Sequence, residues 1–254
     1  MINSDLKVDA IVQARMSSTR LPNKVLLYVN EKTLLENVIE RIKHSKFVNR
    51  VIIATTTNRN DDVLEDFCVE KNYFYFRGEE NDVLARFYYA AKEFRCNNIL
   101  RVTPDDPFKD PEIIDEVIKI FLNDSLEFCY NNNPPTFPEG LDTELFTFRA
   151  LEKAFNESTD PFEREHVTQY FYRNPDKFPQ RNYCNFMDLS YLRWTIDTKE
   201  DFELAKLIYS NVGKDKKVFL MDDILTFINK NKWVLDINKN AKRSAMYNKT
   251  SDNE

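Results

Sequence analysis

Short apolar runs alternate with amphipathic stretches along the first half of the chain. The run Val8–Val12 is rich in apolar residues, as is typical of a strand covered on both faces. In Thr33–Lys43 the apolar residues recur at helical spacing, and Thr33 with Glu36 fits a capping box. The whole pattern predicts strands at 8–12, 51–55, 73–76, 99–102 and 128–130, and helices at 33–43, 61–71, 82–94 and 111–122.

The pattern loosens after residue 130, where Asn131–Pro135 is rich in turn formers. Beyond it we expect strands at 143–147 and 192–196 and helices at 148–158, 161–174, 198–210 and 221–229. Residues 239–254 are polar and aperiodic, so a disordered tail is expected there. We therefore predict a single domain at 1–238, with a small lobe at about 131–190.

Strands that alternate with helices predict an α/β fold with a Rossmann-like, doubly wound and mostly parallel sheet. Ligands of such sheets bind beyond the carboxyl ends of the strands. Four of the predicted strand ends run into polar segments, and we expect these segments to converge on one site. They lie at 15–24, 55–58, 77–82 and 103–106.

Composition narrows the class of protein. The 254 residues are 42% hydrophobic and carry a net charge of −6, with acidic and basic residues interspersed. This balance argues against general nucleic-acid binding, which needs a strongly basic face. No apolar run approaches the roughly 18 residues of a membrane span, and the first residues lack a signal-peptide pattern. We expect a soluble, cytoplasmic protein whose four widely spaced cysteines are buried free thiols.

Cations and hydroxyls crowd the loop after the first predicted strand. Arg15, Ser18, Arg20 and Lys24 lie between that strand and the next helix. Backbone N–H groups of such a loop, with Arg and Lys beside them, suit a phosphate. An ordinary connection with solvated charges fits the same spacing, and the chain has no Walker-type phosphate loop.

Two aspartates follow predicted strands further along the chain. Asp105 stands with Asp106 between two prolines, and Asp197 follows the run Trp194–Ile196. Together they could hold Mg²⁺, which takes oxygen ligands and commonly keeps substrate phosphate in its shell. The alternative is that Asp105 belongs to a turn and that Asp197 neighbours a helix cap.

Two further polar groups invite a functional interpretation. Arg77, Asp82 and Arg86 surround Gly78 at a predicted strand end, where Asp82 could also cap the next helix. Arg164 and His166 lie in a charged stretch of a predicted helix, where they could contact a carboxylate or a sugar hydroxyl. A solvated helix face with paired charges is the competing interpretation of that stretch.

Seven motifs in order resemble the cytidylyltransferase family that activates acidic sugars. Its SpsF-like (spore coat polysaccharide biosynthesis) branch is the most similar, and that branch is related to the CMP-Kdo and CMP-acylneuraminate synthetases. The opening motif is Ala10–Leu26, which includes Gln13-Ala14-Arg15. The other motifs lie at 54–57, 76–86, 101–107, 137–142, 163–168 and 192–198, so the resemblance covers about residues 8–238.

The resemblance implies the nucleotide-diphospho-sugar transferase fold and a homodimer formed through the 131–190 lobe. It further implies a Mg²⁺-dependent enzyme that transfers CMP from CTP to an acidic sugar, or to another phosphorylated or carboxylated acceptor, in surface polysaccharide synthesis. By the same resemblance, the triphosphate is expected to be bound by Arg15, Ser18, Arg20 and Lys24, and the metal is expected to be bound by Asp105 and Asp197. The base is expected to be bound by Ala14, Thr55, Arg77, Asp82 and Arg86. The acceptor is expected to be bound by Asp142, Glu144, Arg164 and His166.

Two departures from the family pattern stand out. Asn23 occupies a position where glycine is frequent, and asparagine tolerates the left-handed backbone that glycine permits. Pro104 stiffens the next loop, and Asp106 adds a second possible metal ligand beside Asp105. Two alternatives also remain: a transferase that uses another nucleotide on a sugar 1-phosphate, and a CTP-binding protein without turnover.

Overall fold

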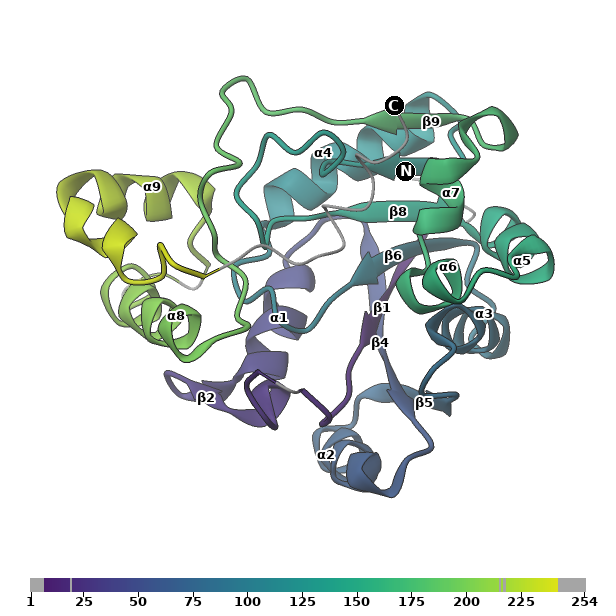
Figure 1. Cartoon of the computed structure of the whole chain (residues 1–254), viewed down its shortest axis with the longest axis horizontal. Helices are drawn as coiled ribbons and strands as arrows, with labels where there is room; N and C mark the ends of the chain where they lie inside the picture. The colour runs from purple at the N-terminus through teal and green to yellow at the C-terminus, as the bar shows by residue number, and fades with distance from the viewer. Residues whose placement is uncertain (1–6, 19, 215, 217, 242–254) are drawn as a thin grey trace.

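The computed structural model describes residues 7–18, 20–214, 216 and 218–241. A seven-stranded sheet crosses its centre in the order β5-β4-β1-β6-β8-β7-β9 (Figure 1). β8 pairs antiparallel with both of its neighbours, and the other pairings in the sheet are parallel. The strands are β1 Val8–Gln13, β4 Val48–Thr56, β5 Phe74–Gly78, β6 Asn98–Val102, β7 Phe128–Tyr130, β8 Glu144–Thr147 and β9 Gln180–Asn182. A small hairpin pairs β2 Tyr28–Val29 with β3 Lys32–Thr33.

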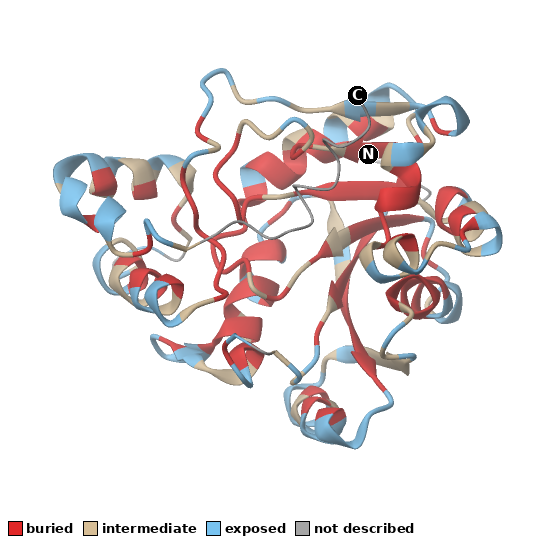
Figure 2. Ribbon diagram, viewed as in Figure 1, coloured by how far each residue is buried: buried red, intermediate tan, exposed pale blue. Residues whose placement is uncertain are grey.

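Helices cover both faces of the sheet because the residues of its strands alternate between the faces. Ala10 and Val12 pack in one apolar cluster with α1, α2 and α4, whereas Ile11 packs in a second cluster with α3, α5 and α7. Figure 2 shows the buried residues concentrated in the central strands. The helices are α1 Leu34–Ile42, α2 Asp62–Lys71, α3 Val83–Glu93, α4 Pro111–Asn123, α5 Phe148–Glu157, α6 Pro161–His166, α7 Gln169–Arg173, α8 Lys199–Asn211 and α9 Met221–Lys230.

A third apolar cluster fastens the C-terminal helices beside the sheet. It joins α8 and α9 to Phe108, which follows β6, and to Trp194. The buried Trp194 ring lies edge-on to Phe108, with the ring centroids 6.3 Å apart. This packing holds the segment that carries Asp197 against the loop that carries Asp105, so it brings the two predicted metal ligands to the same end of the sheet.

The predicted fold class is confirmed, and most predicted elements agree with the structure to within a few residues. The predicted capping box of α1 is present: Glu36 N donates to Thr33 Oγ1 over 3.2 Å, and Thr33 N donates to Glu36 Oε2 over 2.9 Å. Cys68, Cys96 and Cys129 are buried free thiols, as expected, whereas the free thiol Cys184 is exposed. Within the described ranges, no helix is long and apolar enough to cross a membrane.

Two sequence predictions about secondary structure were wrong, and some short strands were missed. Residues 192–196 form no strand but a buried loop, in which Arg193 makes one isolated bridge with Glu139. The predicted helix 161–174 is two helices, because Val167 adopts φ 50° and ends α6. The short strands β2, β3 and β9 were not predicted. The domain bounds 1–238 remain a prediction, and residues 242–254 of the predicted tail lie outside the described residues.

Candidate active site

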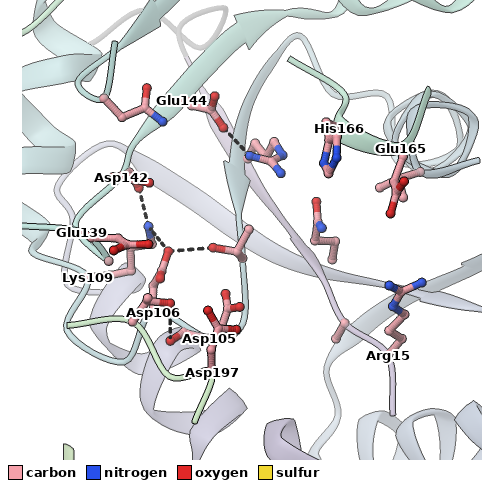
Figure 3. A pocket seen from close by; sticks show the side chains of 18 of the residues that line it. Arg15, Asp105, Asp106, Lys109, Glu139, Asp142, Glu144, Glu165, His166 and Asp197 are labelled. Carbon is pink, nitrogen blue, oxygen red and sulfur yellow. Dashed lines mark hydrogen bonds and ion pairs between the residues drawn. The ribbon is translucent and has the colours of Figure 1, made fainter. Parts of the chain in front are cut away.

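A cavity of about 320 Å³ opens at the carboxyl ends of the central strands (Figure 3). A smaller cavity of about 260 Å³ adjoins it on the side of the loop that follows β1. Asp105, Asp106 and Asp197 gather on one side of the larger cavity, opposite Arg15 and His166. The larger cavity is lined by Gln13, Ala14, Arg15, Arg20, Val83, Arg86, Arg101, Thr103, Asp105, Asp106, Lys109, Asn132, Glu139, Gly140, Asp142, Glu144, Glu165, His166, Thr195 and Asp197.

Lys24 bridges the two predicted metal ligands. Its Nζ lies 2.9 Å from Asp105 Oδ2 and 2.9 Å from Asp197 Oδ1, and it also donates to the Ile196 carbonyl over 2.8 Å. Burial works against the charged form of Lys24, but the two carboxylates outweigh it and raise the pKa of Lys24 above its usual value. Since an ammonium has three N–H donors, all of them are used in this arrangement.

Asp105, rather than Asp106, faces Asp197. Asp106 is buried and turned the other way: its Oδ2 accepts from Thr103 Oγ1 over 2.6 Å and pairs with Lys109 Nζ over 2.8 Å. Burial is the largest influence on both aspartates and favours their neutral forms. In Asp105 the adjacent Lys24 outweighs it and lowers the pKa, whereas the pKa of Asp106 stays raised. The partners of Asp106 turn it away from Asp197, and the role of Asp105 as the metal ligand stays a prediction.

A divalent metal fits this carboxylate pair. Among the described residues, no group of three or more His, Cys, Asp or Glu side chains is placed to hold a metal. Mg²⁺ does not need such a cage, because it usually binds one or two carboxylates together with water and substrate phosphate oxygens. Asp105 and Asp197 both line the two cavities, and an ion shared by them would take the place of Lys24 between their oxygens.

Arg193 holds Asp197 in place from behind. Its guanidinium pairs with Glu139 over 2.8 Å, with Asp197 Oδ2 over 2.8 Å and with Asp201 over 3.1 Å, and it is buried. Asp201 also caps α8, where it accepts from the backbone N of Thr198. One arginine thus joins three carboxylates from two distant segments of the chain.

Gly140 allows those two segments to touch. Its φ is +107°, and an added Cβ would lie 2.8 Å from the backbone N of Thr195. Beside it, Trp194 N donates to the Glu139 carbonyl over 2.7 Å. Only glycine combines this backbone conformation with so close an approach.

The loop after β1 forms one wall of both cavities. Ser17, Ser18 and Lys24 line the smaller cavity, whereas Arg15 and Arg20 line both. Arg20 Nη2 also contacts Asp197 Oδ1 over 3.0 Å. Asn23 adopts φ 58°, the left-handed conformation expected for a residue that replaces glycine.

Five of the remaining predicted site residues line the larger cavity, although several are already paired. Glu144 accepts from the Tyr172 hydroxyl over 2.9 Å and pairs with Arg101 across the β6–β8 ladder. Lys109 donates to the Asp142 carbonyl. The five residues are Ala14, Arg86, Asp142, Glu144 and His166.

Four predicted site residues do not line either cavity. Arg77 pairs with Asp62 over 2.7 Å and donates to the Thr56 carbonyl over 2.8 Å, so it joins α2 to the sheet. Asp82 caps α3 and pairs with Arg164 over 2.7 Å. Arg164 also donates to the carbonyls of Phe155 and Ser158. Thr55 is fully buried in β4. The structure therefore does not bring Thr55, Arg77, Asp82 and Arg164 to the cavities.

Sequence reasoning also missed residues that line the cavity or organise it. Gln13, Lys109, Glu139, Glu165 and Arg193 received no role, although all but Lys109 lie inside the recognised motifs. The available signal for these residues was a polar side chain next to apolar ones inside a recognised motif. A buried charge needs a partner, so Arg193 beside Trp194 indicated a carboxylate nearby.

Val167 holds a strained turn directly after His166. Its φ of 50° and ψ of −65° form a γ-turn, which is rare for a β-branched residue, and Thr168 N donates to the His166 carbonyl over 2.5 Å. The turn ends α6 where the His166 ring packs edge-on against Phe162, with ring centroids 4.5 Å apart. Strain of this kind gathers at functional sites.

The strain at Val167 predicts that a glycine replacement is more stable than an alanine replacement, which reverses the usual order of these two residues. Val167→Gly and Val167→Ala both lose a buried side chain, but only glycine adopts positive φ without cost. We expect the glycine variant to exceed the alanine variant by about 1 kcal/mol in free energy of unfolding, measured in urea. Equal stability, or a more stable alanine variant, would show that the turn carries no strain.

Comparison with known proteins places the chain in a class and then in a family. The fold is that of nucleotidyltransferases, the nucleotide-diphospho-sugar transferase fold. The profile of the cytidylyltransferase family matches residues 10–240, and the chain belongs to that family. The predicted resemblance to its SpsF-like branch is confirmed.

Three relatives illustrate the likeness. The spore coat polysaccharide biosynthesis protein SpsF of Bacillus subtilis is 32% identical over 87% of this chain and 93% of its own length. A solved cytidylyltransferase from Leptospira borgpetersenii is 38% identical, with a TM-score of 0.85 over 94% of this chain and 99% of that one. The structure of CMP:2-keto-3-deoxy-manno-octonic acid synthetase complexed with CTP has a TM-score of 0.61, covering 80% of this chain and 98% of that one. At 14% identity, that last likeness shows the fold alone.

Proposed function

We propose that this protein transfers the CMP unit of CTP to an acidic sugar or a similar small-molecule acceptor, in the synthesis of a surface glycan. An acceptor oxygen attacks the α-phosphorus, the bond to the bridging oxygen of the leaving group breaks, pyrophosphate departs, and the acceptor proton passes to solvent. The observation that carries the proposal is the cation-rich loop of β1 facing Asp105 and Asp197 across adjoining cavities. Membership of the cytidylyltransferase family supports CTP as the donor.

The triphosphate is assigned to the smaller cavity. Arg15, Arg20 and Lys24 supply positive charge there, and Ser18 supplies a hydroxyl. Negative charge grows on the leaving pyrophosphate in the transition state, so fixed cations accelerate the reaction. Because all donors of Lys24 are already used, a phosphate oxygen must displace one of its present partners.

Asp105 and Asp197 are assigned to Mg²⁺. When bound, the ion supplies positive charge that reduces repulsion between the phosphate oxygens and an incoming acceptor oxygen. Arg193 pairs with Asp197 and holds it at the cavity, and Lys24 pairs with Asp105 there. Asp106 keeps Lys109 and Thr103 in position beside them.

The acceptor is assigned to the half of the larger cavity lined by Asp142, Glu144 and His166. Carboxylates and an imidazole there suit sugar hydroxyls. Arg164 was expected to contact the acceptor, but it pairs with Asp82 and donates to the Phe155 carbonyl instead. We assign a carboxylate on the acceptor to Arg101, which it would share with Glu144, or to Lys109, which it would share with Asp106.

Nucleotide selectivity tests this proposal. Each of the four nucleoside triphosphates is added with Mg²⁺, first alone in thermal-shift assays and then with a pool of acidic sugars and phosphorylated acceptors. We expect CTP, and none of the other three nucleotides, to raise the melting temperature and, with the acceptor pool, to release pyrophosphate. Release with UTP, GTP or dTTP in place of CTP would refute the proposal in favour of a sugar-1-phosphate transferase. Binding of CTP without release over a broad acceptor panel would favour a binding protein.

A further inference from the structure

Two residues that line the larger cavity each carry a buried polar atom without a hydrogen-bond partner among the described residues. The two atoms are Gln13 Oε1 and Arg86 Nε. Buried polar atoms are nearly always paired, so each exception calls for an explanation. One is an acceptor and the other is a donor, and both belong to residues that line the same cavity.

The two residues come from neighbouring elements. Gln13 ends β1, and Arg86 lies in the first turn of α3. Ile11 of β1 packs in one cluster with Val83 and Leu84 of α3, which places the two elements against each other. Ala14 and Val83 supply apolar lining at this corner.

Arg86 is held through its Nη1, and its Nε–H has no partner among the described residues. The side chain is 2% exposed, and its Nη1 donates to the carbonyls of Glu79 and Glu80. Burial and the nearby Arg15 lower the pKa of Arg86 to about 10, so it stays charged at neutral pH. An arginine can donate but cannot accept, so the group it faces must be an acceptor.

A hydrogen-bond acceptor beside a hydrogen-bond donor is complementary to the edge of cytosine but not to that of uracil. Cytosine presents its exocyclic amino group, a donor, next to ring nitrogen N3, an acceptor. Uracil reverses both, with a carbonyl next to an N3–H. Resting on the proposed function, we infer that Gln13 accepts a hydrogen bond from the cytosine amino group and that Arg86 donates to the ring side of the same edge. Gln13 is thus the residue that selects CTP over UTP.

The test is the ratio of CTP to UTP affinity, measured by calorimetry with Mg²⁺ and without acceptor. A ratio cancels contributions of the triphosphate, which both nucleotides share. We expect Gln13→Met to lower the ratio by about tenfold, chiefly through weaker CTP binding. Gln13→Glu keeps an acceptor at the same position, so it should retain the preference for CTP.

Gln169→Met is the matched control. Gln169 lies in α7, and its Oε1 is also buried without a partner in the described part of the chain, but it does not line the cavity. Its variant should keep the ratio of the unmodified protein. An unchanged ratio in Gln13→Met, or a lost preference in Gln13→Glu, would overturn the assignment while leaving the proposed function standing. Equal binding of CTP and UTP by the unmodified protein would instead refute both.

Discussion

Asp105→Asn is expected to lower kcat for pyrophosphate release by roughly 10²–10³ while the fold stays intact. Asparagine keeps the shape of the side chain but removes the charge that faces Asp197 and pairs with Lys24. A neutral amide is a poorer ligand for Mg²⁺ and leaves Lys24 with a single carboxylate partner. Initial rates at saturating CTP measure the loss, and circular dichroism confirms the fold.

Asp236→Asn provides the comparison for that variant. Asp236 is exposed and pairs only with the surface residue Lys239, over 2.9 Å, among the contacts that the structure describes. Its variant should turn over CTP at the rate of the unmodified protein. If Asp105→Asn did the same, Asp105 would have no part in the reaction, and the assignment of the metal to this carboxylate pair would fail.

Arg193→Met should cost about 3–5 kcal/mol of the free energy of unfolding at neutral pH. The variant leaves Glu139, Asp197 and Asp201 buried without the guanidinium that now joins them. Denaturation in urea measures the loss. Arg181→Met is the control, because Arg181 is half exposed and pairs with Asp124 at the surface. Its cost should stay below about 1 kcal/mol.

The pH dependence of stability separates lost charge pairing from lost packing. Although burial opposes it, hydrogen bonding with Arg193 lowers the pKa of Asp201 in the folded protein. That contribution is present above the unfolded pKa of an aspartate and disappears as the pH falls through the folded pKa. Without Arg193 the burial of Asp201 is opposed less strongly, so this contribution shrinks and the variant should lose less stability than the unmodified protein as the pH falls through the same range. A deficit that is constant with pH would show that packing alone was lost.

Local pattern was sufficient to predict the elements that frame the site. The apolar run of β1 and the capping box at Thr33 are short-range features, and the cation-rich loop stands between them in the sequence. Parallel strands place their carboxyl ends together, so the convergence of Asp105 with Arg15 and Lys24 followed from the fold class alone. Asp197 was placed beside Asp105 as the residue after a predicted strand at 192–196, although that segment is a loop in the structure.

Tertiary pairing decided what the sequence could not predict. Residues 192–196 look like a strand because they are apolar, yet they are buried as a loop by Gly140 on one side and α8 on the other. Arg164 is cationic like a ligand residue, but Asp82, 82 positions away, takes it. The proposed role of Gln13 rests on the absence of a partner within the described chain, which only coordinates reveal. The homodimer stays a prediction, because a single chain does not test it.

Mass spectrometry of the products tests the central claim most directly. The protein is incubated with CTP, Mg²⁺ and the acceptor that supports pyrophosphate release, and both products are quantified. Transfer predicts an acceptor heavier by one CMP unit, formed in equal amount to pyrophosphate, and absent when UTP replaces CTP. Free CMP with an unmodified acceptor, or a product that carries a different nucleotide, would contradict the account.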